Sequence, residues 1–246
     1  MTRSMYRLGG LVLACVAVMF AVAGCRDTPE SQVLAQYRKG EQAIADYNVA
    51  AYKSVISPHA IEDMQGELAL AMTADASVTK TLRPSTMMFV IALRNRQPLQ
   101  YLKRMSVDDY ILWLMEQGFI TVDADNDIYP YSVSFKQGAA MVQMGMKVEA
   151  ERSSGIRFGR RRGSGLVSLI SAAVPRSELV PLEGYEVTYV QMNGAWVSDG
   201  AALANTIDQW LKEESASEKM SVPEFILMIE QESHGSLKQD LFSPPK

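Results

Sequence analysis

The spacing of hydrophobic and polar residues divides the chain into a helical first part and a strand-rich second part. Before Gly118, apolar residues recur every three or four positions, which is the period of a helix with one buried face. Thr28-Pro29-Glu30 and Ser57-Pro58 each combine a capping side chain with a proline suited to the first turn. A third apolar helix spans 86–96, and Ser106 opens a fourth helix that ends at Gly118.

The period then changes to the two-residue alternation of β-strands. Residues 131–151 contain two alternating runs around Gly138, which predicts an antiparallel hairpin. Asn193-Gly194 lies between two further β-rich runs and predicts a second hairpin with a tight turn. Two helices follow, one around Leu211 and one capped by Ser221. Helices followed by an antiparallel sheet and a C-terminal helix are typical of the α+β class.

The first 24 residues form a separate segment. Arg3 and Arg7 precede an apolar run of about 16 residues, which is shorter than the roughly 20 that a bilayer span requires. A positive start, an apolar middle and small residues before Cys25 indicate a secretory signal peptide. The alternative is an uncleaved membrane anchor; in both cases Arg3 and Arg7 favour the cytoplasmic side and leave the remaining chain outside.

Val22-Ala23-Gly24-Cys25 resembles the lipobox of bacterial lipoproteins. The resemblance implies that residues 1–24 are removed and that Cys25 becomes the lipidated N-terminus, followed by a tether over 25–30. Cys15 would leave with the signal peptide, so no disulfide could form in the mature chain. We therefore expect a lipid-anchored protein of the cell envelope that faces away from the cytoplasm, as in a periplasm. Arg26, where a retention aspartate would stand, favours the outer membrane if the organism has one.

"VTYVQMNGAWVSD" resembles the closing strands of nuclear-transport-factor-2-like domains, in which a curved sheet forms a cone around a long N-terminal helix. The resemblance implies one α+β domain over 31–235 with insertions near 58–118 and 152–181. The segment after it ends in Ser243-Pro244-Pro245-Lys246, and we expect a flexible tail over 236–246. Such cones often hold an apolar pocket, and in some relatives an acid there transfers protons. The candidate pocket-lining residues are Tyr185, Tyr189 and Trp196. The assigned inward strand positions are Val142, Met144, Met146 and Val148, none of which titrates.

Few residues suggest catalysis or metal binding. The chain has two histidines and no zinc-binding or G-x-S-x-G motif, so we predict no catalytic residue, no metal ligand and no cofactor. Asp123, Asp125 and Asp127 have the spacing of the first ligands of a calcium loop, but the loop glycine and the closing glutamate are absent. An acidic turn before a strand is the preferred interpretation.

"RFGRRRGSG" is the one cluster of positive charge in a chain whose net charge is −4. A solvated hairpin tip is the simpler interpretation. The alternative is an anion-binding site for a phosphorylated envelope glycolipid or an acidic partner protein. Its candidate residues are Arg157, Arg160, Arg161 and Arg162. The acidic balance of the whole chain argues against a nucleic-acid partner.

Three functions remain open from the sequence. The first is a lipid-anchored envelope protein whose non-enzymatic domain binds a partner or a small ligand. The second is a small isomerase-like enzyme, which requires a buried acid or histidine facing an apolar cavity. The third is a purely structural role in envelope assembly. The absence of a catalytic motif favours the first.

Overall fold

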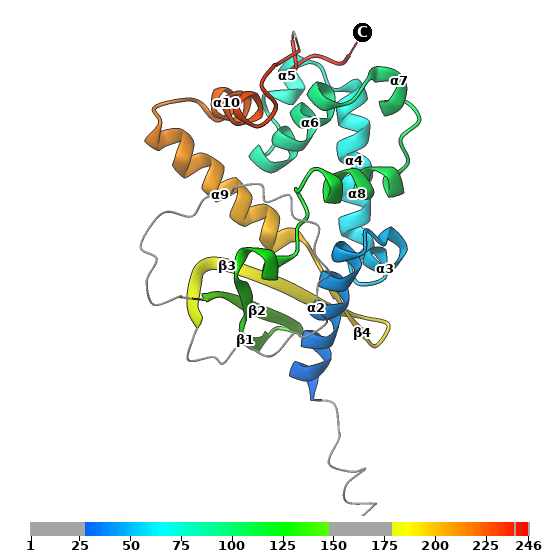
Figure 1. Cartoon of the computed structure of the whole chain (residues 1–246), viewed down its shortest axis with the longest axis vertical. Coiled ribbons are helices and arrows are strands. Elements are labelled where there is room, and N and C mark those ends of the chain that lie inside the picture. Colours follow the sequence, from blue (N-terminus) through cyan, green and yellow to red (C-terminus); the bar gives the residue numbers. More distant parts are fainter. Residues whose placement is uncertain (1–27, 148–178, 239, 246) are drawn as a thin grey trace, which may run out of the picture.

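The chain folds into an antiparallel sheet at one end and a group of helices at the other (Figure 1). The computed structural model describes residues 28–147, 179–238 and 240–245. Within these ranges helices come first, the sheet follows, and two helices come after it. The predicted α+β class, with N-terminal helices, an antiparallel sheet and a C-terminal helix, is confirmed.

The first helices begin at the predicted capping residues. Helix α2 (Pro29–Ala45) starts after Thr28, whose hydroxyl accepts a hydrogen bond from the Ser31 amide at 3.1 Å. After the short helix α3 (Val49–Lys53), a parallel bridge between Ile56 and Ser198 joins the chain to the last strand. Helix α2 packs on one face of the sheet, where Val33 and Tyr37 are buried.

The helical end of the molecule is built mainly from the segment between α3 and the sheet. Its elements are α4 (Pro58–Thr73), α5 (Ala76–Thr79), α6 (Pro84–Arg96), α7 (Leu99–Leu102) and α8 (Val107–Glu116). Ser57 caps α4, and Ser106 and Asp109 form both hydrogen bonds of a capping box at α8. Apolar faces of α4, α6 and α8 meet in one core around Leu68, Leu93 and Leu114. The segment that we expected to be an insertion therefore has its own hydrophobic core.

The sheet is open and has four strands within the described residues. They pair antiparallel in the order β1 (Ile128–Lys136), β2 (Ala139–Lys147), β3 (Leu179–Met192) and β4 (Ala195–Ser198). Asn193 and Gly194 both have positive φ, at 50° and 82°, and form the predicted turn. The register of β2 and β3 shifts between Gln143 and Gly145, where an added Cβ would lie 3.1 Å from the Val180 carbonyl oxygen.

That irregularity changes the predicted alternation along β2. Val142 and Met144 are buried as expected, but Gly145 is buried next to them. Met146 is consequently only half-buried, although the two-residue period assigns it to the inward face. Val148, the fourth assigned position, lies outside the described residues.

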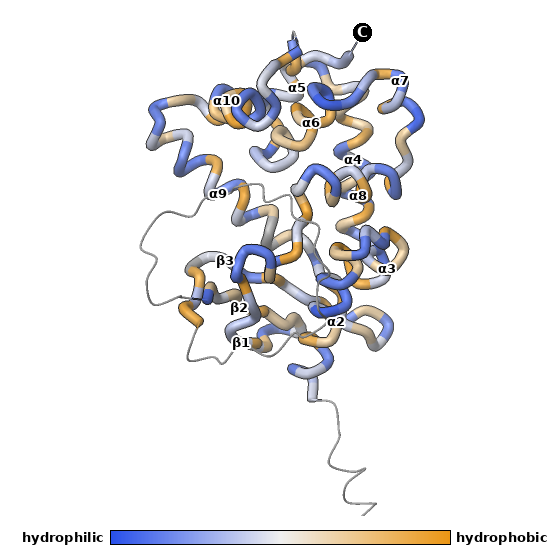
Figure 2. Tube along the Cα trace, viewed as in Figure 1, coloured by the Kyte–Doolittle hydropathy of each residue, from blue (hydrophilic) through white to orange (hydrophobic). Residues whose placement is uncertain are grey.

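Two helices after the sheet complete the helical end. Helix α9 (Ala201–Ser217) runs from the sheet to the other helices, and α10 (Val222–His234) packs beside α6 (Figure 1). Ser221 and Glu224 form the capping box of α10, and Gly235 ends it at a φ of 77°. Figure 2 shows hydrophobic segments gathered where α6 and α10 face each other. Leu211, Phe225 and Ile226 are buried in this core.

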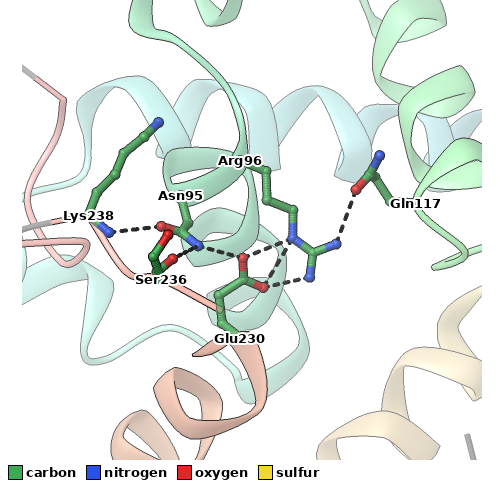
Figure 3. Close-up of polar contacts among 6 residues, drawn as sticks. All are labelled: Asn95, Arg96, Gln117, Glu230, Ser236 and Lys238. Atoms are coloured by element: carbon green, nitrogen blue, oxygen red, sulfur yellow. Dashed lines mark hydrogen bonds and ion pairs between the residues drawn. The ribbon is translucent and has the colours of Figure 1, made fainter. Parts of the chain in front are cut away.

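A buried ion pair connects α6 to α10 (Figure 3). Arg96 Nη2 lies 2.6 Å from Glu230 Oε2, and the two side chains are 10% and 5% exposed. Asn95 Nδ2 donates to Glu230 and to the Ser236 carbonyl oxygen, while Gln117 accepts from Arg96. Because both charges have partners, the network holds the end of α6 to α10 without an uncompensated buried charge.

Arg94 joins the segment after α10 to the helical core. The Arg94 side chain is buried and donates to the carbonyl oxygens of Leu241 and Phe242 at 3.1 and 2.7 Å. Leu241 is itself buried, and the Lys238 amino group donates to the carbonyl oxygens of Arg94 and Gln97. We expected a flexible tail over 236–246; its described residues are held by these contacts.

Candidate functional site

Four tyrosines and two carboxylic acids meet where α2 crosses the sheet, and we call this group the acid–tyrosine cluster. Its members are Tyr37 and Glu41 on α2, Tyr52 on α3, Asp123 in the short 3-10 helix η1 (Asp123–Asn126), and Tyr185 and Tyr189 on β3. Figure 2 shows η1 as a strongly hydrophilic turn at the junction between the sheet and the helices. Elements far apart in the sequence therefore supply one polar group of side chains.

Asp123 lies at the centre of the hydrogen bonds. The Tyr37 hydroxyl donates to Asp123 Oδ2 at 3.0 Å, and the Tyr185 hydroxyl donates to Oδ1 at 2.9 Å. The backbone amide of Asp123 donates to Glu41 Oε2 at 2.8 Å. Glu41 thereby satisfies an amide at the start of η1 and places its carboxyl group beside that of Asp123.

Burial dominates the electrostatics of the two acids. It raises the pKa of Asp123, although the two tyrosine hydrogen bonds oppose that rise. Burial and the neighbouring charge of Asp123 raise the pKa of Glu41 to about 8, against stabilisation by the backbone amides of η1. Glu41 therefore retains a proton at neutral pH, and the pair carries less than its full negative charge.

The phenols of the cluster remain protonated for the same reason. Burial is the main cause that raises the pKa of Tyr37, Tyr185 and Tyr189, and it raises that of Tyr52 to about 12. The charges of Glu41 and Asp123 add to the rise at each phenol. The tyrosines consequently act as neutral hydrogen-bonding groups around the acids.

A positive partner is absent from the described surroundings of the two acids. Within residues 28–147, 179–238 and 240–245, no lysine, arginine or histidine forms an ion pair with Glu41 or Asp123. None of these residues is among the causes that shift the pKa of either carboxyl group. Buried carboxylates normally have a cation nearby, so this arrangement is unusual for a purely structural network.

The candidate pocket-lining residues all lie on the face of the sheet that α2 covers. Tyr189 and Trp196 are buried together with Val142, and Tyr185 packs at the edge of the same group. Tyr185 reaches Asp123, whereas the Trp196 ring lies 5.8 Å from that of Phe135. The structure thus brings two of the three predicted residues into the acid–tyrosine cluster and places Trp196 in the apolar core.

The other sites proposed from the sequence divide into two groups. Cys25 and the candidate anion-binding residues Arg157, Arg160, Arg161 and Arg162 lie outside the described residues. In the acidic turn, Asp125 and Asp127 are exposed while Asp123 turns toward the tyrosines. The described part of the chain holds no group of three or more side chains suited to a metal ion.

The sequence analysis missed Glu41 as a site residue and considered Asp123 only as part of a calcium loop or an acidic turn. Glu41 stands four residues after Tyr37 and three before Ile44, within the apolar stripe of α2. An acid at a core-facing position of an amphipathic helix indicates a buried carboxyl group. Asp123 offered no comparable signal, because its partners come from α2 and β3.

Two hollows on the described surface lie elsewhere, at the helical end. One of about 520 Å³ is lined by Lys219, Met220, Glu224, Leu227, Met228, Gln231 and Leu237. The other, of about 290 Å³, lies beside the Arg96–Glu230 network and is mostly polar. The acid–tyrosine cluster is therefore not part of either hollow.

Comparisons with protein-family models, with curated proteins and with solved structures found no match to this chain. Among the helices formed by the described residues, none has both the length and the apolar character needed to cross a membrane.

Proposed function

We propose that this chain is a lipid-anchored protein of the cell envelope whose folded domain is a non-enzymatic binding domain. The observation that carries the proposal is Val22-Ala23-Gly24-Cys25 behind a positive start and an apolar run. Its mature form has Cys25 as the lipidated N-terminus and no further cysteine. Several acyl chains hold such a protein firmly, because each buried methylene contributes about 0.8 kcal/mol.

The start of α2 supports an anchored arrangement. Thr28 caps this helix only three residues after Cys25, and three residues span at most about 11 Å. The start of α2 lies at the sheet end of the molecule, and α10 lies at the opposite end (Figure 1). In the proposed arrangement the sheet end is near the membrane, and the helical end with its hollow of about 520 Å³ faces away from it.

Replacing Cys25 with serine is expected to abolish lipid labelling, because the serine hydroxyl does not form the thioether. The measurement is incorporation of radioactive palmitate by growing bacteria, followed by immunoprecipitation of the chain. The variant should also accumulate as a longer, unprocessed chain that retains residues 1–24. Cys15→Ser is the matched control and should be labelled and processed like the wild type. Labelling of the Cys25→Ser chain, or its loss in Cys15→Ser, would contradict the proposal.

A second candidate function is proton transfer by a small isomerase-like enzyme. The pKa of Glu41, raised to about 8 beside Asp123, favours it because a general acid or base works best when it titrates near neutral pH. Such an enzyme also needs a cavity for its substrate at these acids, and the two hollows described above lie at the helical end. A binding domain therefore remains the preferred function.

A further inference from the structure

The polar hollow of about 290 Å³ lies where three helices end. Helix α6 ends at Arg96, α8 ends at Glu116, and α10 ends at His234. The residues at or next to these ends line the hollow: Asn95, Arg96, Gln97, Gln117, His234 and Ser236. All six are polar, and none of these described lining residues is acidic. The volume is close to the lower end of the roughly 300–1,000 Å³ range of small-molecule sites, so a ligand held here is small.

Arg96 faces the hollow with one nitrogen of its guanidinium group only weakly bonded. The side chain is 10% exposed, and its Nε and Nη2 donate to the Glu230 carboxylate at 2.6–3.1 Å. Among the described residues, Nη1 has one acceptor, Gln117 Oε1, at the long distance of 3.4 Å. The Phe119 ring packs against the group, 4.7 Å from Cζ. Nη1 therefore remains a donor that can take a stronger acceptor.

Gln117 supplies a second donor at the hollow. Its Oε1 faces Arg96, so its amide nitrogen is turned away from the ion pair (Figure 3). That nitrogen has no hydrogen-bond partner among the described residues. Glu230, by contrast, is not one of the lining residues, and its oxygens accept hydrogen bonds from Arg96 and Asn95. The hollow consequently meets the positive side of the buried ion pair.

We propose that this hollow binds the carboxylate group of a small organic acid, which accepts hydrogen bonds from Arg96 Nη1 and from the Gln117 amide nitrogen. This inference rests on the proposed binding function and names the class of its ligand. Hydrogen bonds from a guanidinium group to a carboxylate are charge-assisted and belong to the strong ones. Because Glu230 and the surrounding helices already hold Arg96 in place, little side-chain freedom is lost on binding.

Other ligand classes fit the hollow less well. A cation would meet the guanidinium group and no acid among the described lining residues. A doubly charged phosphate is disfavoured because helix C-termini carry partial negative charge. The Lys238 amino group offsets this charge at α6, where it donates to the Arg94 and Gln97 carbonyl oxygens. An apolar molecule would leave the polar lining groups without partners. A ligand with one negative charge therefore suits the hollow best.

A binding titration of the full-length chain, purified in a mild detergent, tests the proposal with sodium acetate as the probe at pH 7.5. Binding is followed by calorimetry and by the melting temperature. Acetamide is the matched control because it has the same shape without the charge, sodium chloride controls for ionic strength, and inorganic phosphate is the competing anion. We expect saturable acetate binding with a dissociation constant on the order of 1 mM. Acetamide and phosphate should each bind about tenfold more weakly or less.

Three variants connect the binding to the hollow. Arg96→Lys keeps a positive charge beside Glu230 but removes Nη1, so acetate should bind about tenfold more weakly. Gln117→Met leaves the ion pair intact and should weaken binding about threefold to tenfold. Arg104→Lys makes the same exchange as the first variant at an exposed position in the turn after α7 and should bind like the wild type. If Arg96→Lys does not fold, Gln117→Met decides the question.

Four results would overturn the proposal: no saturable acetate binding, acetamide binding as tight as that of acetate, phosphate binding as tight as that of acetate, or unchanged acetate binding in either variant of the hollow. Lipid labelling of Cys25 is independent of these results. A chain that is labelled at Cys25 but binds no acetate keeps the proposed anchor and loses this ligand.

Discussion

Replacing Arg94 with methionine is expected to lower the free energy of unfolding by about 3–5 kcal/mol, an unusually large effect for one substitution. Arg94 is 2% exposed, and its guanidinium group donates to the carbonyl oxygens of Leu70, Ala71 and Ala74 at the end of α4. It also binds the Thr79 hydroxyl and the two carbonyl oxygens of the C-terminal segment. Methionine fills similar space but leaves these buried acceptors without a donor, and each loss is costly.

Urea unfolding at 25 °C, followed by circular dichroism, measures this loss. Arg104→Met is the matched control, since Arg104 is exposed in the turn after α7 and should change stability by less than about 0.5 kcal/mol. Arg94→Lys should lie between the two, because an ammonium group keeps the charge but reaches fewer of the acceptors. An Arg94→Met chain within about 1 kcal/mol of the wild type would show that the arginine does not hold the C-terminal segment.

Raising the pH from 5.5 to 8.5 is expected to lower the melting temperature by about 5 °C. For a chain of this size, a change of 1 kcal/mol in the free energy of unfolding shifts the melting temperature by about 2–4 °C. Glu41 has a pKa of about 8 in the folded state, against 4.5 when unperturbed. Between these values the folded chain binds more protons than the unfolded chain, so stability falls as the pH rises. Glu67, whose pKa burial raises to about 7 beside the Tyr110 hydroxyl, acts in the same direction.

Glu41→Gln should flatten this pH profile, because glutamine still accepts the Asp123 amide hydrogen bond but does not titrate. The groups that face Glu41 are Tyr37 from α2, Tyr52 from α3, Asp123 and Asp125 from the η1 turn, and Tyr185 and Tyr189 from β3. The tyrosines stay neutral throughout the interval. Asp109 and Glu224 have pKa values lowered by their capping serines and lose their stabilisation only at more acidic pH.

Differential scanning calorimetry at several pH values measures the profile, with Glu62→Gln as the exposed control. The melting temperature of the control should depend on pH as that of the wild type does. The Glu67→Gln variant should lose only part of this pH dependence. A melting temperature that rises from pH 5.5 to 8.5 would contradict the protonation assigned to Glu41.

Local signals in the sequence predicted much of the fold. Proline after Thr28 and Ser57, the Ser106 capping box and the Asn193-Gly194 turn all act within a few residues, and each appears at the predicted place. The alternation along β2 fails only past Met144, next to a register shift that depends on the neighbouring strand. A bulge depends on how two strands pair, and its one local signal here is Gly145, because a glycine inside a strand often marks a bulge.

The candidate site was much less predictable, because its contacts join distant parts of the chain. Tyr185 was expected to face the interior, and it does reach Asp123, but nothing near either residue indicates the other. Asp123 was interpreted as part of an acidic turn before a strand, and only the packing of α2 against the sheet brings Tyr37 to it. Arg94 similarly comes directly after the apolar residues of α6, and no neighbouring residue in the sequence indicates its acceptors. These acceptors lie in α4 and in the C-terminal segment.

The anchoring of the chain is tested most directly by mass spectrometry of the mature N-terminus. The chain is purified from bacterial membranes, digested, and its N-terminal peptide is sequenced and weighed. We predict a peptide that begins at Cys25, lacks residues 1–24 and carries a diacylglyceryl group on the cysteine sulfur. A peptide that retains residues 1–24, or one that begins elsewhere with Cys25 unmodified, would contradict the proposed lipid anchor.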